Sequence, residues 1–179
     1  VDWVTLPGDH TDYAPTPGSG SNADLNRVFD DCTAAVDAMV DFSPFVGINI
    51  MVNDVLDCCA WGGGRFATLD GVTKSWRTTW NPPWAFRQEG IIAHEMGHGF
   101  GLPHANKFDG DGNPYDSPWD VMSAATGYAT TDPTYGALGK HVNAYHKDAL
   151  GWFPAARRFT APPDSSTSLE LDHTALAGA

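Results

Sequence analysis

The chain has 179 residues, a hydrophobic content of 42% and a formal net charge of −12 at pH 7. This length and apolar content suffice for one core, filled by seven tryptophans and nine phenylalanines, so we expect one compact, monomeric domain. The 22 acidic against 10 basic residues argue against nucleic acid or an anionic membrane as a partner. No apolar run approaches the roughly 18 residues of a membrane span, and Val1 follows no signal-like segment, so we expect a processed chain.

The N-terminal part is predicted to hold two strands around a helix. Residues 2–6 fit a short strand, and the Pro-, Gly- and Ser-rich stretch 15–21 leads to a helix over about Asp24 to Val40. Residues 46–53 are rich in Ile and Val, which predicts a buried strand.

A glycine-rich loop is expected over residues 57–64, followed by a hairpin of strands 65–69 and 72–80. One strand of this region is expected to form the edge of the sheet. Because side chains alternate along a strand, the last strand has two distinct faces, one with Trp76, Thr78 and Trp80 and the other with Ser75, Arg77 and Thr79.

The three cysteines leave one unpaired whichever two form a disulfide. Cys32 falls in the predicted helix, and Cys58 and Cys59 are adjacent in the loop. In an exported protein we expect Cys32 to bond to Cys58 or to Cys59, which would tie the first helix to the loop.

A group of candidate metal-binding residues begins at His94. His94 and His98 are four residues apart, so on a helix their imidazoles project from one face and can bind one ion. Neutral imidazole is a good zinc ligand. Glu95 lies about 100° round the helix, beside the ion, where it can act on a metal-held water. Asn81 to Pro83 would open this helix, and Ile92, Met96 and Phe100 would supply its buried face.

A third histidine follows where the helix must end. Gly101 suits the left-handed conformation of a helix end, and Pro103 prevents the helix from resuming. The chain would then turn back and deliver His104 to the same ion, which leaves a fourth position open for water, as in catalytic zinc sites. The alternative, histidines that line an ordinary core helix, does not account for Gly101 and His104 at this spacing.

The loop after His104 carries alternating oxygen ligands. Their spacing resembles a calcium loop of the EF-hand type, but Pro114 stands where such loops need glycine. We favour the alternative, a polar loop rich in turns whose side chains bond the backbone. The calcium ligands, if this ion binds, are Asp109, Asp111, Asn113, Ser117 and Asp120.

The C-terminal part is predicted to be mostly loops, with a helix from about Lys140 to Leu150. Residues 161–166 resemble a linker, and residues 168–172 resemble the first strand of a further unit. Segment 161–179 is therefore expected to be a linker or the start of a truncated β domain, with a tail packed on the main domain as the alternative.

The segment His94 to His104, followed by Trp119 to Ser123, resembles the metzincin clan of zinc endopeptidases. In that clan a methionine on a tight turn forms an apolar floor under the metal, and Met122 matches it. Residues 144–152 are similar to a helix and exit strand of gametolysin-like and immune-inhibitor-like members. The resemblance covers about residues 45–152.

This resemblance implies an α+β, zincin-like metzincin fold, with a twisted mixed sheet, an antiparallel edge strand and two long helices. A smaller, loop-rich C-terminal subdomain would end in a helix. The catalytic domain would span residues 1–160, with an upper subdomain at about 1–101 and a lower one at about 102–160.

The resemblance also implies a secreted, extracellular enzyme that hydrolyses internal peptide bonds. Zn²⁺ would be held by His94, His98 and His104, Glu95 would be the general base, and a polypeptide substrate would lie as an extended strand beside the sheet edge. Two other readings stay open: a protein- or glycan-binding module that does not cut, and a zinc hydrolase of a non-peptide amide.

The chain departs from astacin-like and serralysin-like members after the methionine. Those members have a tyrosine two residues further on, which helps to hold the transition state, whereas Ser123 and Ala124 follow Met122 here. We expect Tyr128 and Tyr135 to be packing or surface residues. The remaining histidines lack ligand-like spacing: His10, His141, His146 and His173.

Overall fold

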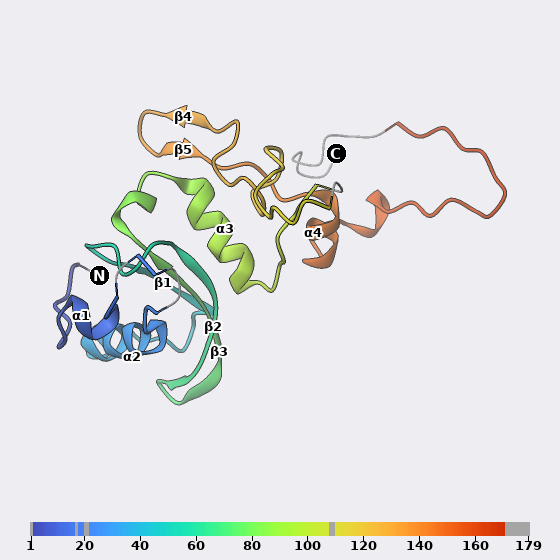
Figure 1. The fold of residues 1–179 in the computed structure, drawn as a ribbon. Coiled ribbons are helices and arrows are strands. Elements are labelled where there is room, and N and C mark those ends of the chain that lie inside the picture. The colour runs from blue at the N-terminus through green and yellow to red at the C-terminus, as the bar shows by residue number, and fades with distance from the viewer. Residues whose placement is uncertain (1, 17, 20–21, 108–109, 171–179) are drawn as a thin grey trace.

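The computed structural model describes residues 2–16, 18–19, 22–107 and 110–170, and within them the chain is a mixed α+β structure (Figure 1), as expected. The elements follow in chain order as α1 (His10–Tyr13), α2 (Leu25–Val36), β1 (Gly47–Met51), β2 (Trp61–Leu69), β3 (Val72–Asn81), η1 (Pro83–Ala85), α3 (Glu89–Gly99), β4 (Thr130–Asp132), β5 (Gly136–Leu138), α4 (Ala144–Ala149) and η2 (Ala155–Arg157).

The main sheet has the strand order β1-β3-β2. β1 runs parallel to β3, and β2 pairs with β3 in antiparallel fashion, which confirms the expected mixed sheet with an antiparallel edge strand. β3 leads through the short turn η1 directly to α3, so the central strand of the sheet positions the helix that carries His94 and His98.

One face of this sheet packs on α2. Trp76 and Trp80 of β3 are buried in one apolar cluster with Val28 and Phe29 of α2 and Ile50 of β1. α2 begins at the N-cap Asp24, whose side chain accepts a hydrogen bond from the backbone N–H of Arg27. Burial of these aromatic and branched side chains is the main source of stability for the N-terminal half.

The other face of the sheet packs on α3, and it does so through glycine. A Cβ atom added to Gly62 of β2 would lie 1.8 Å from the backbone oxygen of Glu95. Gly99, near the end of α3, lies close to the backbone oxygen of Gly63 in the same way. Because no side chain separates them, the edge strand and the motif helix are in direct backbone contact.

The part of the chain that follows α3, residues 102–107 and 110–157, is here called the lower half; in the view of Figure 1 it lies above α3, on the opposite side from the sheet. It has its own apolar cluster, made by the buried residues Leu102, Val121, Met122 and Ala125. Its regular elements in the described residues are the hairpin β4–β5, the short helix α4 and the single turn η2. The N-cap of α4, Asn143, accepts a hydrogen bond from the N–H of His146. The helix predicted at 140–150 is therefore present but shorter, and the hairpin was not predicted.

Two expectations for the N-terminal half are wrong. Residues 2–6 form no strand, and the first element is instead the single turn α1. The predicted glycine-rich loop 57–64 ends earlier, because β2 already begins at Trp61, paired with Trp80, and Gly62 is paired with Thr79. Pairing with β3 outweighs the weak strand preference of glycine.

The expected buried face of the motif helix is also wrong. Met96 is 38% exposed, and Ile92 and Phe100 are only partly buried. The buried positions of α3 are instead Gly90, His94, Glu95 and Gly97. The helix lies between the sheet and the lower half, and its buried positions are glycines, His94 and Glu95. The spacing of its large apolar residues therefore does not show which sides of the helix are buried.

The disulfide expected between Cys32 and the loop is not formed. Cys58 and Cys59 are instead bonded to each other, and Cys32 has a free thiol. Cys32 lies on the side of α2 that packs against the apolar cluster, so its side chain is directed into the core of this layer. Burial raises the pKa of this thiol to about 11.

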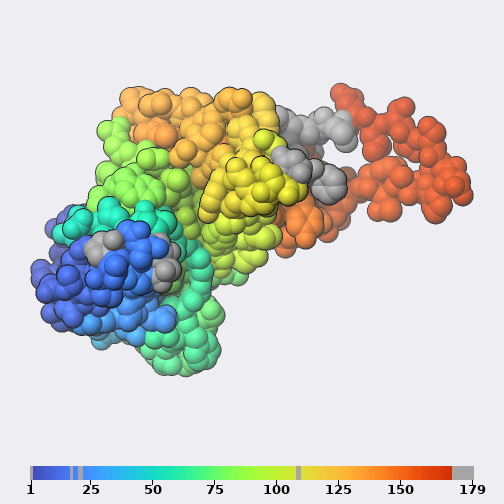
Figure 2. All heavy atoms as spheres, in the orientation of Figure 1, coloured from blue at the N-terminus to red at the C-terminus, as the bar shows by residue number. Residues whose placement is uncertain are grey.

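The chain beyond η2 leaves the body of the molecule (Figures 1 and 2). Residues 161–170 are exposed and contain no helix or strand. The strand predicted at 168–172 is thus absent from residues 168–170, and its last two residues lie outside the described part. None of the helices in the described ranges is both long and apolar enough to cross a membrane.

The contact between β2 and α3 predicts different effects for two neighbouring glycines. Gly62→Ala should destabilise the protein by about 1–3 kcal/mol, because its methyl group would displace the backbone of Glu95. Gly63→Ala is the matched control, since a Cβ there has no atom within 4 Å, and its stability should be unchanged or slightly raised. Urea unfolding of both variants measures this, and equal midpoints would refute the close approach.

The cysteine arrangement predicts one slowly reacting thiol. At pH 8 only about 0.1% of a thiol with a pKa of about 11 is ionised, so iodoacetamide should alkylate native Cys32 slowly, and faster as the pH rises. After unfolding without reduction, one label should be found at Cys32 by peptide mapping, and two more after reduction. A label on Cys58 or Cys59 before reduction would contradict the bond between them.

Candidate metal centre

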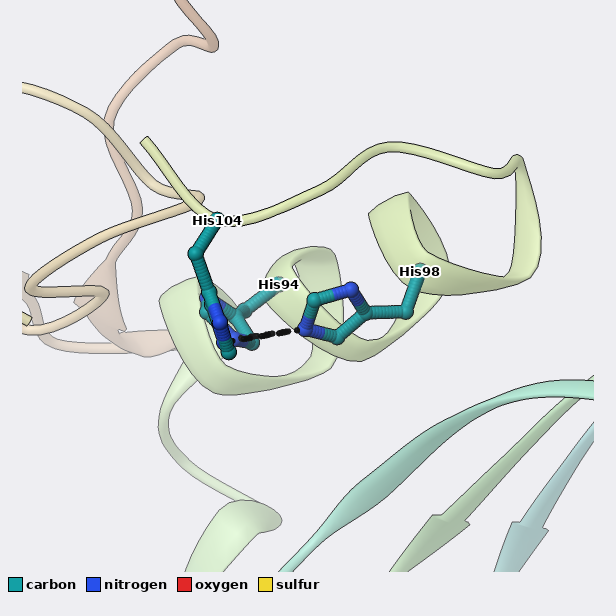
Figure 3. A group of neighbouring side chains, drawn as sticks. All are labelled: His94, His98 and His104. Carbon is teal, nitrogen blue, oxygen red and sulfur yellow. Dashed lines mark hydrogen bonds between the residues drawn. The ribbon is translucent and has the colours of Figure 1, made fainter. Parts of the chain in front are cut away.

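Three histidine side chains converge on one point at the end of α3 (Figure 3). His94 and His98 project from the helix, and His104 comes down to them from the segment that follows. The Nε2 atom of His98 lies 3.1 Å from that of His94 and 3.3 Å from that of His104. In the described part of the chain this is the only group of three or more His, Cys, Asp or Glu residues that can hold a metal ion.

The turn that delivers His104 is a helix end of the Schellman type. Gly101 has a φ of +86°, the left-handed conformation expected for it. Its N–H donates to the carbonyl of His98 at 2.9 Å, and the N–H of Leu102 donates to the carbonyl of Gly97 at 2.9 Å. The chain therefore reverses within two residues, which brings His104 back over the helix, as the sequence predicted.

Two backbone carbonyls orient the rings of the helix histidines. The Nδ1–H of His94 donates to the carbonyl of Val121 at 2.7 Å, and that of His98 donates to the carbonyl of Leu102 at 2.9 Å. A carbonyl oxygen can only accept, so in the neutral rings Nδ1 carries the hydrogen and Nε2 carries a lone pair. Both lone pairs point to the centre of the cluster, the arrangement in which histidine binds a metal.

The donor geometry fits a small tetrahedral cation. Ligand nitrogens about 2.05 Å from a tetrahedral zinc ion are about 3.3 Å apart, close to the 3.1 Å and 3.3 Å found here. Burial lowers the pKa of both His94 and His104, which favours the neutral rings that bind metals. Three imidazoles leave room for a further ligand, so the cluster resembles an open site more than a closed structural one.

Glu95 is a buried carboxyl group with no hydrogen-bond partner among the described residues. Glu95 is the residue directly after His94 on α3, and it is 8% exposed. Burial raises its pKa to about 7. A carboxyl group in this environment can accept and release a proton near neutral pH, which is the behaviour of a general acid–base residue.

Met122, the predicted floor of the site, packs on α3 at Gly97. It is fully buried, and its sulfur would be 2.2 Å from a Cβ atom added to Gly97, which stands between His94 and His98 on α3. A tight turn holds it, because the N–H of Ser123 donates to the carbonyl of Asp120 at 3.1 Å. The same turn supplies the Val121 carbonyl that orients His94.

The residues of the calcium hypothesis bond mainly to backbone. Asp111 accepts from the N–H of Asn113, and Asn113 accepts from the N–H of Tyr115, as in a polar loop rich in turns. Asp120 accepts from the N–H groups of Met122 and Asn143, and the N–H of Ser117 donates to Ser123. Asp109 lies outside the described residues, so calcium binding stays a prediction.

Sequence reasoning missed one residue at this site. The ring of Tyr115 lies 5.0 Å from that of His104 and 6.1 Å from that of His94, measured between ring centres. Tyr128 instead stacks on Trp119 and is 70% exposed, and Tyr135 is exposed beside the β4–β5 turn, in line with their predicted surface roles. No sequence signal marks Tyr115, because its position depends on how the loop after His104 folds back.

The other histidines predicted not to be ligands lie outside the cluster. The Nε2 atom of His10 is 2.9 Å from the carbonyl oxygen of Val55, and His146 is buried in α4. His141 is not part of the cluster either, and His173 lies outside the described residues.

The cluster predicts one tight site for a divalent metal. Chelator-treated protein should take up one equivalent of Zn²⁺. His104→Ala should weaken zinc binding by more than about 100-fold, because loss of a residue that only hydrogen-bonds a metal ligand already lowers the affinity by about 10- to 100-fold. His10→Gln, which changes a histidine bonded to backbone carbonyls, should leave the affinity unchanged. Competition with a chromogenic chelator measures both, and unaltered affinity of the His104 variant would exclude the three-histidine site.

Comparison with known proteins adds no relative. No protein-family model matches the chain, and neither the curated proteins nor the solved structures contain a match to it.

Proposed function

We propose that the protein is a secreted, zinc-dependent endopeptidase of the metzincin type. The observation that carries this proposal is the buried residue Glu95, whose carboxyl group has no hydrogen-bond partner among the described residues, directly after the first of three histidines with converging imidazole nitrogens. A purely structural metal site needs no acid–base group beside it. Three neutral histidines and an N···N spacing close to the tetrahedral value favour zinc as the ion.

The surroundings of the site support the metzincin assignment. Met122 lies on a tight turn against α3 between the two helix ligands, and Gly101 ends that helix so that His104 can return. The helix lies against a mixed sheet whose edge strand is antiparallel to its neighbour. Each of these features is one that the resemblance to metzincins implied from the sequence.

The residues of the site divide the chemistry of peptide hydrolysis between them. A zinc ion bound there would supply a Lewis acid and a water of lowered pKa. Glu95 takes the proton from the attacking water and later passes it to the amine that leaves. Burial, which raises the pKa of Glu95, favours uptake of that proton, and a cation beside the carboxyl group favours its release. The carbonyls of Val121 and Leu102 keep the ligand rings in place throughout.

The proposed substrate is a polypeptide in an extended conformation. β2 pairs with β3 along one side, and no described strand pairs with its other side. Gly62, Gly63 and Gly64 leave this part of the edge without side chains, and Gly62 lies against the backbone of Glu95. An extended peptide can add to such an edge through main-chain hydrogen bonds, which accept many sequences.

Replacement of the base should separate binding of metal from turnover. Glu95→Gln should keep its zinc but lose about 100- to 10,000-fold of its kcat/KM on casein, because the amide cannot accept the proton. Glu89→Gln is the matched control on the same helix: among the described residues its carboxylate bonds only the N–H of Gly139, and activity should be kept. Digestion with and without chelator measures this, and a fully active, zinc-loaded Glu95→Gln protein would overturn the role of Glu95.

The same digestion tests the proposed function against its alternatives. The zinc-loaded protein should cleave casein or gelatin internally, and a chelator should stop it. A protein that binds polypeptide or glycan without cutting would be a binding module, and one that cleaves only small non-peptide amides would be an amidase.

A further inference from the structure

The side chain of Tyr115 reaches the metal centre from a loop that the proposed mechanism does not use. Its ring stands almost perpendicular to that of His104, at an interplanar angle of 71° and a centre-to-centre distance of 5.0 Å. It also lies 6.1 Å from the ring of His94. The side chain is partly open to solvent, since Tyr115 is 56% exposed, so it borders the mouth of the site.

The loop around Tyr115 is held to the turn of Met122. The hydroxyl of Ser123 donates to the carbonyl of Pro114 at 3.1 Å and accepts from the N–H of Ser117 at 3.0 Å. On the other side, the N–H of Lys107 donates to Asp116 at 2.8 Å. Because the flanking residues are bonded to the same turn that orients His94, the position of Tyr115 is linked to that of the ligands.

The backbone of Glu95 and the loop of Tyr115 belong to different layers around α3. Glu95 stands on the side of the sheet, where its backbone meets Gly62, whereas Gly97 faces Met122 and the lower half. The loop of Tyr115 belongs to that lower half, through Ser123. The histidines are therefore bordered by the sheet layer at Glu95 and by the loop that carries Tyr115.

The hydroxyl of Tyr115 is available as a donor. No described residue forms a hydrogen bond with it, whereas its backbone N–H is already bonded to Asn113. Lys140, the basic residue bonded to the segment after Met122, donates instead to the carbonyls of Ala124 and Gly127. A phenol hydroxyl with no partner at the mouth of a hydrolytic site is suited to bind an oxygen of the substrate.

We propose that Tyr115 is a catalytic residue whose hydroxyl donates a hydrogen bond to the oxygen of the scissile carbonyl, and more strongly to the oxyanion that this oxygen becomes. The proposal rests on the proposed function. The edge contact with His104 keeps the ring over the ligands, so the donor is in place before the charge develops.

Removal of this single oxygen tests the proposal. Tyr115→Phe keeps the ring contacts and should lower kcat on a quenched-fluorescence peptide by about 10- to 1,000-fold with little change in KM, as for loss of one oxyanion donor. Tyr128→Phe is the matched control, because Tyr128 stacks on Trp119 away from the ligands, and its kcat should be unchanged.

A binding measurement on the zinc-loaded protein gives a readout other than turnover. A phosphinic peptide carries a tetrahedral oxyanion, and its affinity for Tyr115→Phe should fall by a similar factor, while affinities for zinc and for the product peptide stay the same. Unchanged phosphinate affinity and kcat would mean that Tyr115 only packs on the histidines. Equal losses of zinc, product and phosphinate binding would likewise overturn the proposal, in favour of a structural role.

The two proposals fail in different ways. If the zinc-loaded parent protein cleaves no peptide, the proposed function fails. If the parent cleaves peptides and Tyr115→Phe equals it in kcat and phosphinate affinity, only the role of Tyr115 fails.

Discussion

The position of α3 between two layers is the constraint on which the rest of the structure depends. Gly62 lets the edge strand touch the backbone of the helix on one side, and Gly97 lets the sulfur of Met122 reach it on the other. A methyl group at either place would push one layer away. The helix carries two of the three converging histidines, so these contacts also determine where the ligand rings lie relative to the edge strand and to the turn of Met122.

Some polar groups of the site have hydrogen-bond partners, and others lack a favourable one. The Nδ1–H groups of His94 and His98 are paired with carbonyls, but their Nε2 lone pairs face each other across 3.1 Å. Glu95 is buried with no described partner. Both arrangements cost free energy in a protein without a cation, and a positive ion at the centre relieves both. Both arrangements therefore suit a site that binds a cation.

Much of this site could be predicted because its geometry is local. The spacing of His94 and His98 on one helix, and the turn at Gly101, involve residues within one stretch of chain, where helical periodicity and the backbone freedom of glycine decide positions. Met122 was found only through resemblance to a family. Elsewhere, predictions failed where longer-range contacts decided: pairing with β3 drew Gly62 into a strand, and packing against the apolar cluster kept Cys32 from the loop.

The sequence by itself therefore determined the groups of the candidate site: three imidazoles, one carboxyl group on the same helix, and the turn that joins them. The tertiary structure alone decided which other side chains meet this group. Tyr115 reaches His104 because Ser123 binds the backbone on both sides of it, and the burial that raises the pKa of Glu95 comes from the layers packed around α3. Such effects depend on segments distant in sequence, and no local pattern encodes them.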